Sequence, residues 1–192
     1  MTKYETHALA PGPSKKTAIS INDQRNSPVS MSIMRRIHFC AGHRLHGHEG
    51  KCAHFHGHNY VAEFHVTGSG QDDVGRVIDF SRLKEVLKGW IDEHWDHGFL
   101  LSEKDENGLA AIRQVEPTRY YVMPRNPTAE NMASHLLEEI CPRLLSPLNV
   151  TAWKVVIWES EDACATATLE NATYLEGAIC GSDVTRDAGS WK

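Results

Sequence analysis

The stretch HFCAGHRLHGHEGKCAHFHGHNYVAEFH, residues 38–65, organises the rest of the chain. It contains eight of the twelve histidines and two of the five cysteines. Near its end, residues 60–66 alternate in a pattern that predicts a half-buried strand. His56 and His58 stand two positions apart just before this run, so an extended backbone places both imidazoles on the same face. The stretch therefore predicts a strand that begins with two aligned histidines.

Two aligned imidazoles supply half of a first-row metal site, and zinc is the commonest occupant. His43 follows another strand-like run, residues 32–42, and offers a third nitrogen. Three imidazoles with one open position are typical of catalytic zinc, because structural zinc usually has four protein ligands. Spacing alone leaves His46, His48 and His54 as competing ligands, and it leaves open a solvated, histidine-rich turn. The residues predict a zinc site without fixing its ligand set.

A length of 192 residues suits one domain with a full hydrophobic core. The hydrophobic fraction of 41% and the charged fraction of 23% are ordinary for a soluble globular protein. The net charge of −5 argues against a nucleic acid or an anionic membrane as partner. No apolar run reaches the length of a membrane span, and no hydrophobic signal-peptide core opens the chain. The cysteines are dispersed without a CxxC pair, which favours a reducing cytoplasm. They are Cys40, Cys52, Cys141, Cys164 and Cys180.

Three regions follow from the distribution of patterned sequence. Residues 1–30 are polar and rich in turn formers, which predicts a flexible or loosely docked extension. Residues 31–175 carry the strand and helix patterns and form the predicted domain. Residues 176–192 form a C-terminal tail with little pattern.

Within the domain, the periodicities predict strand, strand, helix, helix, strand, strand. The approximate ranges are 32–40, 59–67, 80–94, 128–142, 152–159 and 163–170. We therefore expect an α+β fold in which two helices cover one face of a four-stranded, mostly antiparallel sheet. The absence of strand–helix–strand alternation and of a glycine-rich phosphate loop argues against a doubly wound nucleotide-binding fold.

Several residues mark the ends of the helices. Asp79 or Ser81 can cap the first helix, Thr128 can cap the second, and Pro142 predicts a break or kink. Residues 102–125 are irregular and polar, with a strand-like patch at 119–123. This segment is expected to be a surface excursion near the site.

Cys52 lies four residues before His56, close to the predicted metal. Its thiol has two interpretations, a fourth zinc ligand or an acid/base group whose pKa is lowered by the neighbouring cation. Cys40 competes for either role, although a strand residue of this kind is more often a small buried hydrophobe.

Asp96-His97 and Glu159 are two further candidates. Adjacent side chains seldom bond each other, so Asp96 and His97 need not form a dyad within one copy, and such a pair after a helix often supplies only a charge and a cap. His97 gains a role if it reaches Cys52, because histidine exchanges protons near neutral pH. Glu159 is either a solubilising carboxylate at the sheet edge or an anchor for a guanidine-like edge such as that of a pterin.

Six motifs occur in an order that resembles one family, the 6-pyruvoyl-tetrahydropterin synthases and 6-carboxytetrahydropterin synthases. The motifs are FCAGHRL at 39–45, Cys52 with HGHNY at 56–60, VIDF at 77–80, Asp96-His97, NPTAEN at 126–131, and Glu159-Ser160. The resemblance covers about residues 33–170. Each motif alone is modest, and the six in order are specific.

The resemblance implies a tunnelling fold, in which three subunits close their sheets into a barrel and two trimers stack into a hexamer with sites between subunits. It also implies the following roles: zinc ligands His43, His56 and His58, catalytic Cys52, the proton relay Asp96 and His97, and the pterin-anchoring Glu159. The competing ligands His46, His48 and His54 are then bystanders.

The implied substrate is 7,8-dihydroneopterin triphosphate. The queuosine branch of the family forms 6-carboxy-5,6,7,8-tetrahydropterin, acetaldehyde and triphosphate, and the biopterin branch keeps the side chain as a 6-pyruvoyl product. The helix start at 79–84 looks bacterial and favours the carboxytetrahydropterin synthase. The length of 102–125 and the presence of residues 1–30 depart from compact members. A non-catalytic zinc- or pterin-binding protein on the same fold is the contrasting alternative.

Overall fold

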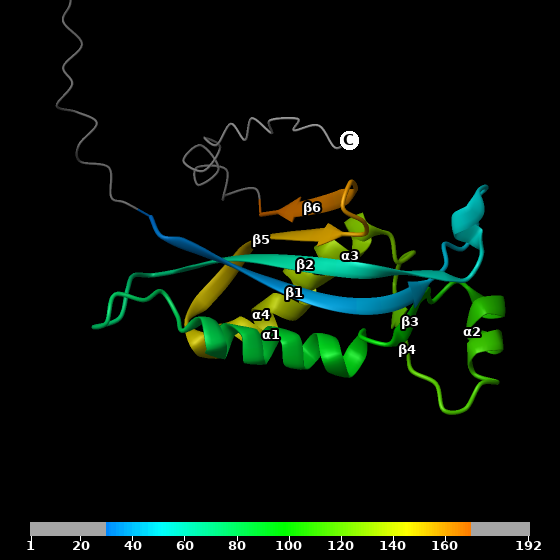
Figure 1. Ribbon diagram of the computed structural model, residues 1–192, viewed down its shortest axis with the longest axis horizontal. Coiled ribbons are helices and arrows are strands. Elements are labelled where there is room, and N and C mark those ends of the chain that lie inside the picture. The colour runs from blue at the N-terminus through cyan, green and yellow to red at the C-terminus, as the bar shows by residue number, and fades with distance from the viewer. Residues whose placement is uncertain (1–29, 170–192) are drawn as a thin grey trace, which may run out of the picture.

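The structure, a computed structural model, describes residues 30–169, so nearly all of the predicted extension and the whole predicted tail lie outside the described residues. Six strands form one sheet in the order β4-β3-β1-β2-β5-β6 (Figure 1). The strands are β1 (Ser32–His43), β2 (His56–Gly68), β3 (Gly98–Ser102), β4 (Tyr120–Met123), β5 (Val150–Trp158) and β6 (Cys164–Thr168). The helices are α1 (Phe80–His94), α2 (Glu106–Ile112), α3 (Ala129–His135) and α4 (Cys141–Leu145), with shorter turns η2 (Lys51–Ala53), η3 (Leu136–Ile140) and η4 (Ser146–Leu148).

The long antiparallel pair of β1 and β2 carries the histidines. Its register sets His43 opposite His56 and Ala41 opposite His58. Alternate residues of both strands are buried, among them Phe39 and Tyr60. Because the period is two, the three histidines continue this buried row at the strand ends. The predicted alignment of His56 and His58 on one face is confirmed.

Helices α1, α3 and α4 cover one face of the sheet and share the main core with it. On α1, the buried residues Leu83, Leu87 and Ile91 form the predicted apolar stripe, and the helix contacts β1. The run from α3 to α4 contacts β5, and α3 also contacts β6. The shorter helix α2 packs against the opposite face at β3, because Leu100 belongs to the main core whereas its neighbour Leu101 packs against Leu109 and Ile112 of α2. Between residues 30 and 169, no helix is long and apolar enough to cross a membrane.

The α+β class is as predicted, and the two predicted helices lie on one face of the sheet, but the count and arrangement of elements are wrong. The sheet has six strands, because β3 and β4 extend it beyond the end of β1. β3 lies between β1 and β4 and pairs in parallel with each of them. The strand-like patch at 119–123 corresponds to β4, whereas β3 and α2 were missed. Both are too short for a periodic signal, since β3 has five residues and α2 has seven. The segment 102–125 is therefore partly ordered into strand and helix.

Pro142 does not end the second helix. It lies in the first turn of α4, where a missing N–H is tolerated, and the helical run continues to η4. The irregularity comes one turn earlier, in the π-helical turn η3. The predicted break is thus a local change of helix geometry before the proline.

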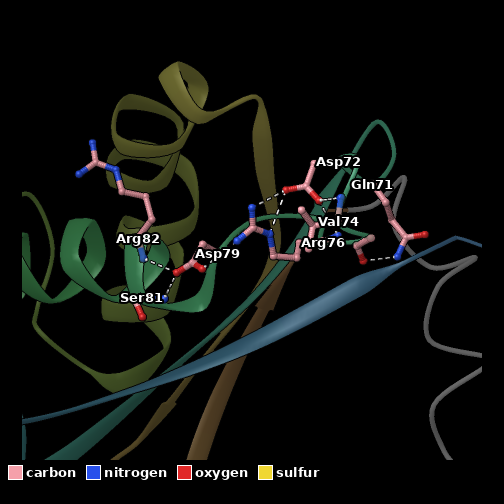
Figure 2. Close-up of polar contacts among 8 residues, drawn as sticks. Gln71, Asp72, Val74, Arg76, Asp79, Ser81 and Arg82 are labelled. Carbon is pink, nitrogen blue, oxygen red and sulfur yellow. Dashed lines mark hydrogen bonds and ion pairs between the residues drawn. The ribbon is translucent and has the colours of Figure 1, made fainter.

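A network of carboxylates and one arginine closes the connection between β2 and α1 (Figure 2). Oδ1 of Asp72 accepts hydrogen bonds from the N–H of Val74 and of Arg76, at 3.0 and 2.9 Å. The Arg76 guanidinium joins Asp72 to Asp79. Oδ1 of Asp79 in turn accepts from the N–H of Ser81 at 2.8 Å, so Asp79 is the predicted helix cap.

Replacing Asp79 by alanine is expected to lower the melting temperature at pH 7, because α1 loses its cap and Arg76 loses a partner. The hydrogen bond from the Ser81 N–H, with help from Arg82 and the Arg76 charge, lowers the pKa of Asp79. A carboxyl whose pKa is lowered by folding stabilises the folded state at pH values above its unfolded pKa. This stabilisation is lost as the pH falls through the pKa of the folded state. The difference from wild type should therefore shrink below about pH 4, the range in which an unperturbed aspartate titrates.

Thermal unfolding of both proteins between pH 3 and pH 8 checks this expectation. Asp73→Asn is the matched control, since Asp73 is an exposed carboxylate of the same turn. An Asp79→Ala protein that melts with wild type at pH 7 contradicts the capping role.

Candidate functional site

Three imidazoles converge at the loop end of the β1–β2 hairpin, where His43 ends β1 and His56 begins β2. One nitrogen of each lies within 4.8 Å of the others, as a shared metal ion requires. Nε2 of His43 is 3.0 Å from Nε2 of His56. His43 is only 1% exposed, and His56 and His58 are half-buried. The structure brings together the three histidines that the resemblance implied.

The outer nitrogens of two imidazoles bind backbone carbonyls. Nδ1 of His43 lies 2.8 Å from the Pro127 carbonyl, and Nδ1 of His56 lies 2.8 Å from the His54 carbonyl. A carbonyl only accepts, so both Nδ1 atoms carry the proton and, in neutral rings, both Nε2 atoms present lone pairs. Two lone pairs 3.0 Å apart repel unless a cation lies beside them. Such outer hydrogen bonds orient metal-binding histidines, so these residues fit a metal ion.

Two further features suit a cation. Nε2 of His58 is buried without a hydrogen-bond partner among the described residues. Burial lowers the pKa of His43, against the opposing effect of the hydrogen bond to Pro127. A lowered pKa keeps the imidazole neutral, and the neutral ring is the form that binds metal.

The other three histidines of the loop do not join the cluster. His46 is exposed, and its Nδ1 lies 3.8 Å from a carboxylate oxygen of Asp105. Nδ1 of His48 accepts a hydrogen bond from the Gly50 N–H at 2.8 Å. His54 is exposed and contributes its backbone carbonyl to His56. Spacing could not separate these residues from the cluster, because the loop is not a regular strand.

Glu159 points at the imidazoles from the end of β5. Its Oε1 lies 3.4 Å from Nε2 of His43 and 3.3 Å from Nε2 of His58, and the Tyr60 hydroxyl donates to it at 3.5 Å. Burial, followed by the Glu159 charge, raises the pKa of Tyr60, so the phenol keeps its proton. A carboxylate in this position can bind zinc or a ligand beside it. The contact with the histidines was not anticipated.

Tyr60 is the site residue that sequence reasoning missed. It lies on the same strand as His58, two positions further, and therefore on the same face. That spacing was the available signal. Its hydroxyl is one of the few groups that hold Glu159 in place.

Cys52 lies in η2, in the loop between β1 and β2, and is half-buried. Its carbonyl accepts a hydrogen bond from the Leu45 N–H at 2.8 Å. The thiol is outside the cluster of metal-binding nitrogens but close enough to Tyr60 to influence that phenol's pKa. Of the two interpretations of Cys52, this position favours a group beside the metal over a fourth ligand.

Asp96 and His97 form a dyad within one copy, a possibility that the sequence left open although adjacent side chains seldom bond each other. Nδ1 of His97 lies 2.9 Å from Oδ2 of Asp96. The reason is the backbone of His97, whose φ of 56° is left-handed and turns its side chain toward Asp96. The backbone of Cys40 fixes this turn through two hydrogen bonds. The Cys40 N–H donates to Oδ1 of Asp96 at 2.8 Å, and the Cys40 carbonyl accepts from the His97 N–H at 2.7 Å.

The environment of Asp96 keeps it charged. Burial raises its pKa, but the hydrogen bonds from the Cys40 N–H and from His97 outweigh burial, and the net pKa is lowered. A charged Asp96 holds the His97 Nδ1–H and leaves Nε2 for proton exchange. The His97 side chain is 79% exposed, so within one copy Nε2 faces solvent.

The dyad borders a hollow of about 390 Å³ at the sheet face opposite to α1, α3 and α4. Cys40, Asn59 and His97 line it. Cys40 is exposed and its thiol donates to Oδ1 of Asn59 at 3.0 Å, so its interpretation as a buried hydrophobe is wrong. Within residues 30–169, no hydrogen bond or ion pair joins His97 to Cys52. The two halves of the candidate relay stand apart in a single subunit.

The sheet, the main helices on one of its faces and the histidine cluster define an α+β enzyme of the tunnelling-fold class. The chain belongs to the 6-pyruvoyl tetrahydropterin synthase family, whose model matches residues 32–170. It is a pterin synthase and a lyase.

Curated relatives carry two names. The chain is 42% identical over 126 residues to the 6-carboxy-5,6,7,8-tetrahydropterin synthase of Rickettsia felis, a match that covers 66% of this chain and 91% of the relative. It is 28% identical over 140 residues to the 6-pyruvoyl tetrahydrobiopterin synthase of Dictyostelium discoideum, covering 68% and 90%.

Solved structures are similar in fold. A 6-pyruvoyl tetrahydropterin synthase from Caenorhabditis elegans is 26% identical, with a TM-score of 0.54 and coverage of 74% of this chain and 97% of that one. An uncharacterized protein from Wolinella succinogenes has a TM-score of 0.64 at 23% identity, with coverage of 74% and 100%.

Proposed function

We propose that the protein converts 7,8-dihydroneopterin triphosphate, with bound zinc, to 6-carboxy-5,6,7,8-tetrahydropterin, acetaldehyde and triphosphate, in queuosine and 7-deazapurine biosynthesis. The observation that carries the proposal is the cluster of three imidazoles whose inner nitrogens face one another. The name of the Rickettsia relative at 42% identity supports the choice of product. The cytoplasmic location expected from the cysteines remains a prediction.

In this proposal His43, His56 and His58 hold the zinc ion. Zinc, when bound, would acidify the hydroxyl groups of the substrate side chain. Three imidazoles, with no cysteine among the clustered residues that the structure describes, favour zinc in a catalytic arrangement with an open position.

Cys52 and His97 are the proposed proton carriers. Cys52, in the loop that joins the strands of the three histidines, would act as its thiolate, which accepts a proton from the substrate side chain and returns it as the thiol. His97 exchanges a proton through Nε2, because Asp96 holds its Nδ1–H in one orientation. Asp96 orients His97 and stabilises its charged form.

Glu159 is the proposed anchor of the pterin. A carboxylate can accept two parallel hydrogen bonds from a guanidine-like ring edge, which fixes the ring relative to the side chain. Its contacts with Tyr60 and the imidazoles support a position directly beside the proposed metal site.

The Glu159→Gln variant distinguishes between two roles of Glu159, an anchor of the pterin and a ligand of the metal. If Glu159 anchors the pterin, KM is expected to rise about 10- to 100-fold with zinc retained, since a hydrogen bond to a charged group contributes about 1.5–3 kcal/mol. Loss of zinc from the variant would instead make Glu159 a ligand. Steady-state kinetics and metal analysis measure both, and Glu161→Gln, an exposed carboxylate of the same turn, is the control.

A homo-oligomer, a dimer of trimers with sites between subunits, is part of the proposal. Among the described residues, one edge of β6 and the edge of β1 before Ala41 have no partner strand. β1 and β6 run in opposite directions, because three antiparallel pairings separate them. Pairing β6 of one copy with β1 of the next would continue the antiparallel pattern of the sheet from subunit to subunit, and repeated pairing can close a ring. The same neighbour could bring His97 to Cys52.

The alternative product is 6-pyruvoyl tetrahydropterin, favoured by the name of the Dictyostelium relative at 28% identity. Mass spectrometry after incubation of the zinc-loaded protein with 7,8-dihydroneopterin triphosphate distinguishes the outcomes. Carboxytetrahydropterin with acetaldehyde supports the proposal, and a 6-pyruvoyl product moves the protein to the biopterin branch. Failure of the zinc-loaded protein to form either product would indicate a binding protein on the same fold.

A further inference from the structure

A buried carboxylate lies beside the loop that carries Cys52. Asp105 is fully buried and stands at the start of α2, in the segment between β3 and β4. Its Oδ1 accepts a hydrogen bond from the Gly108 N–H at 2.9 Å, which caps the helix. Its Oδ2 lies 2.9 Å from Nε of Arg44, the residue directly after His43. One carboxylate thus serves both α2 and the end of β1.

Arg44 is held on a second side by an aromatic ring. Its guanidinium lies over Phe55, 5.4 Å from the ring centroid, and Phe55 meets Phe99 of β3 edge to face at 5.4 Å. A partly desolvated guanidinium is stabilised by such a ring. Arg44 and Phe55 stand on either side of η2, so these contacts tie both ends of the Cys52 loop together.

The residues after Arg44 transmit this restraint to Cys52. The Leu45 N–H donates to the Cys52 carbonyl at 2.8 Å. The backbone of His46 makes two hydrogen bonds with the Asn126 side chain, at 2.9 and 2.8 Å. Leu45 therefore lies between two restrained residues, Arg44 and His46, and its backbone hydrogen bond connects Cys52 to them. In Figure 1 this loop and α2 lie at the same end of the sheet.

We propose that Asp105 is a positioning residue for Cys52, acting through its ion pair with Arg44. The proposal rests on the catalytic role proposed for Cys52. A buried charge is tolerated when it is paired, so the ion pair fixes the side chain of Arg44 and the turn that follows it. A thiol displaced by about 1 Å loses up to about a hundredfold in rate, because proton transfer needs close approach.

The double role of Asp105 provides a sharp test. Asparagine caps helices about as well as aspartate, since its side-chain oxygen also accepts from the backbone. Asp105→Asn therefore keeps the cap to Gly108 and removes the charge that pairs with Arg44 at 2.9 Å, together with its longer, 3.8 Å contact to the exposed His46. A capping role alone predicts no change at Cys52, whereas a positioning role predicts a loss.

The experiment compares the full-length Asp105→Asn protein with wild type and with Glu106→Gln, which removes the neighbouring exposed carboxylate of α2. The expected result is a kcat lowered about 10- to 100-fold with KM within about twofold and zinc retained. The rate of Cys52 alkylation by iodoacetamide, followed by peptide mass spectrometry, should change at least about fivefold, as access and orientation of the thiol change. Exposed Cys164 is the internal reference and should keep its rate.

Wild-type kcat and wild-type Cys52 alkylation in Asp105→Asn would overturn the proposal. If wild type itself forms no pterin product but Cys52 alkylation still changes in the variant, the proposed function fails and the positioning role stands. Should Asp105→Asn not fold, Asp105→Asn/Arg44→Gln removes both charges and leaves neither buried alone. The double variant is expected to show the same selective change at Cys52, and an unchanged Cys52 in that folded protein would also overturn the proposal.

Discussion

Replacing Cys52 by alanine is expected to lower kcat by about 10²–10⁴-fold, the range typical of a lost acid/base group. Zinc content and oligomeric state should not change, because the thiol lies outside the cluster of metal-binding nitrogens. Product formation by mass spectrometry and metal analysis of the same sample provide the measurement. Cys164→Ala is the control, since Cys164 is an exposed thiol on β6. Normal turnover in Cys52→Ala would remove this thiol from the mechanism.

A mixing experiment tests whether Cys52 acts with His97 of another subunit. His97→Ala alone is expected to lose activity to a similar degree. When the two inactive variants are unfolded and refolded together, about a quarter of the sites should pair an intact Cys52 with an intact His97, by random assortment across a heterologous interface. Recovery of activity supports a shared site. If the mixture stays as inactive as its components, each subunit acts alone or the pairing is wrong.

His43→Ala is expected to abolish zinc binding under conditions in which wild type holds the ion. His43 is the most buried of the three imidazoles, and its Nδ1 is fixed by the Pro127 carbonyl, so the variant loses the most firmly oriented of the proposed ligands. The affinity should fall by more than about 100-fold, the upper range for loss of an outer hydrogen bond to a ligand. Metal analysis after dialysis against a zinc buffer measures the change, and activity should disappear with the metal.

His54→Ala is the matched control for this experiment. His54 belongs to the same loop, is exposed, and contributes a backbone carbonyl that alanine retains. It should bind zinc as wild type does. Stoichiometric zinc in His43→Ala, or loss of zinc from His54→Ala, would mean that the ligand set is different. The melting temperature of wild type should also fall when zinc is removed, because a ligand that binds only the folded state stabilises it.

The metal cluster could be anticipated to a large degree from local sequence. Period two on an extended backbone aligned His56 with His58, and the same rule could have included Tyr60. Helix caps were equally local, and Asp79 and Thr128 accept the expected backbone hydrogen bonds. The choice of His43 over the loop histidines needed the resemblance to the family, since an irregular loop has no period from which to argue.

Elements and contacts that depend on distant residues could not be predicted in this way. β3 is short and buried and owes its place to parallel pairing with β1, so no alternation marks it. The Asp96–His97 bond depends on a left-handed residue held by the Cys40 carbonyl. Glu159 comes within reach of His43 because β5 pairs with β2, far away in sequence.

The sequence alone was enough to predict the α+β class, the strand pair that carries the histidines, and the types of residue available for chemistry. These follow from backbone periodicity and capping, which act over a few residues. The tertiary structure was needed to show which nitrogens face one another, that Glu159 reaches the imidazoles, and that Asp105 is buried against Arg44. Such contacts depend on packing between segments that are distant in the chain, and no local pattern encodes the distance between them.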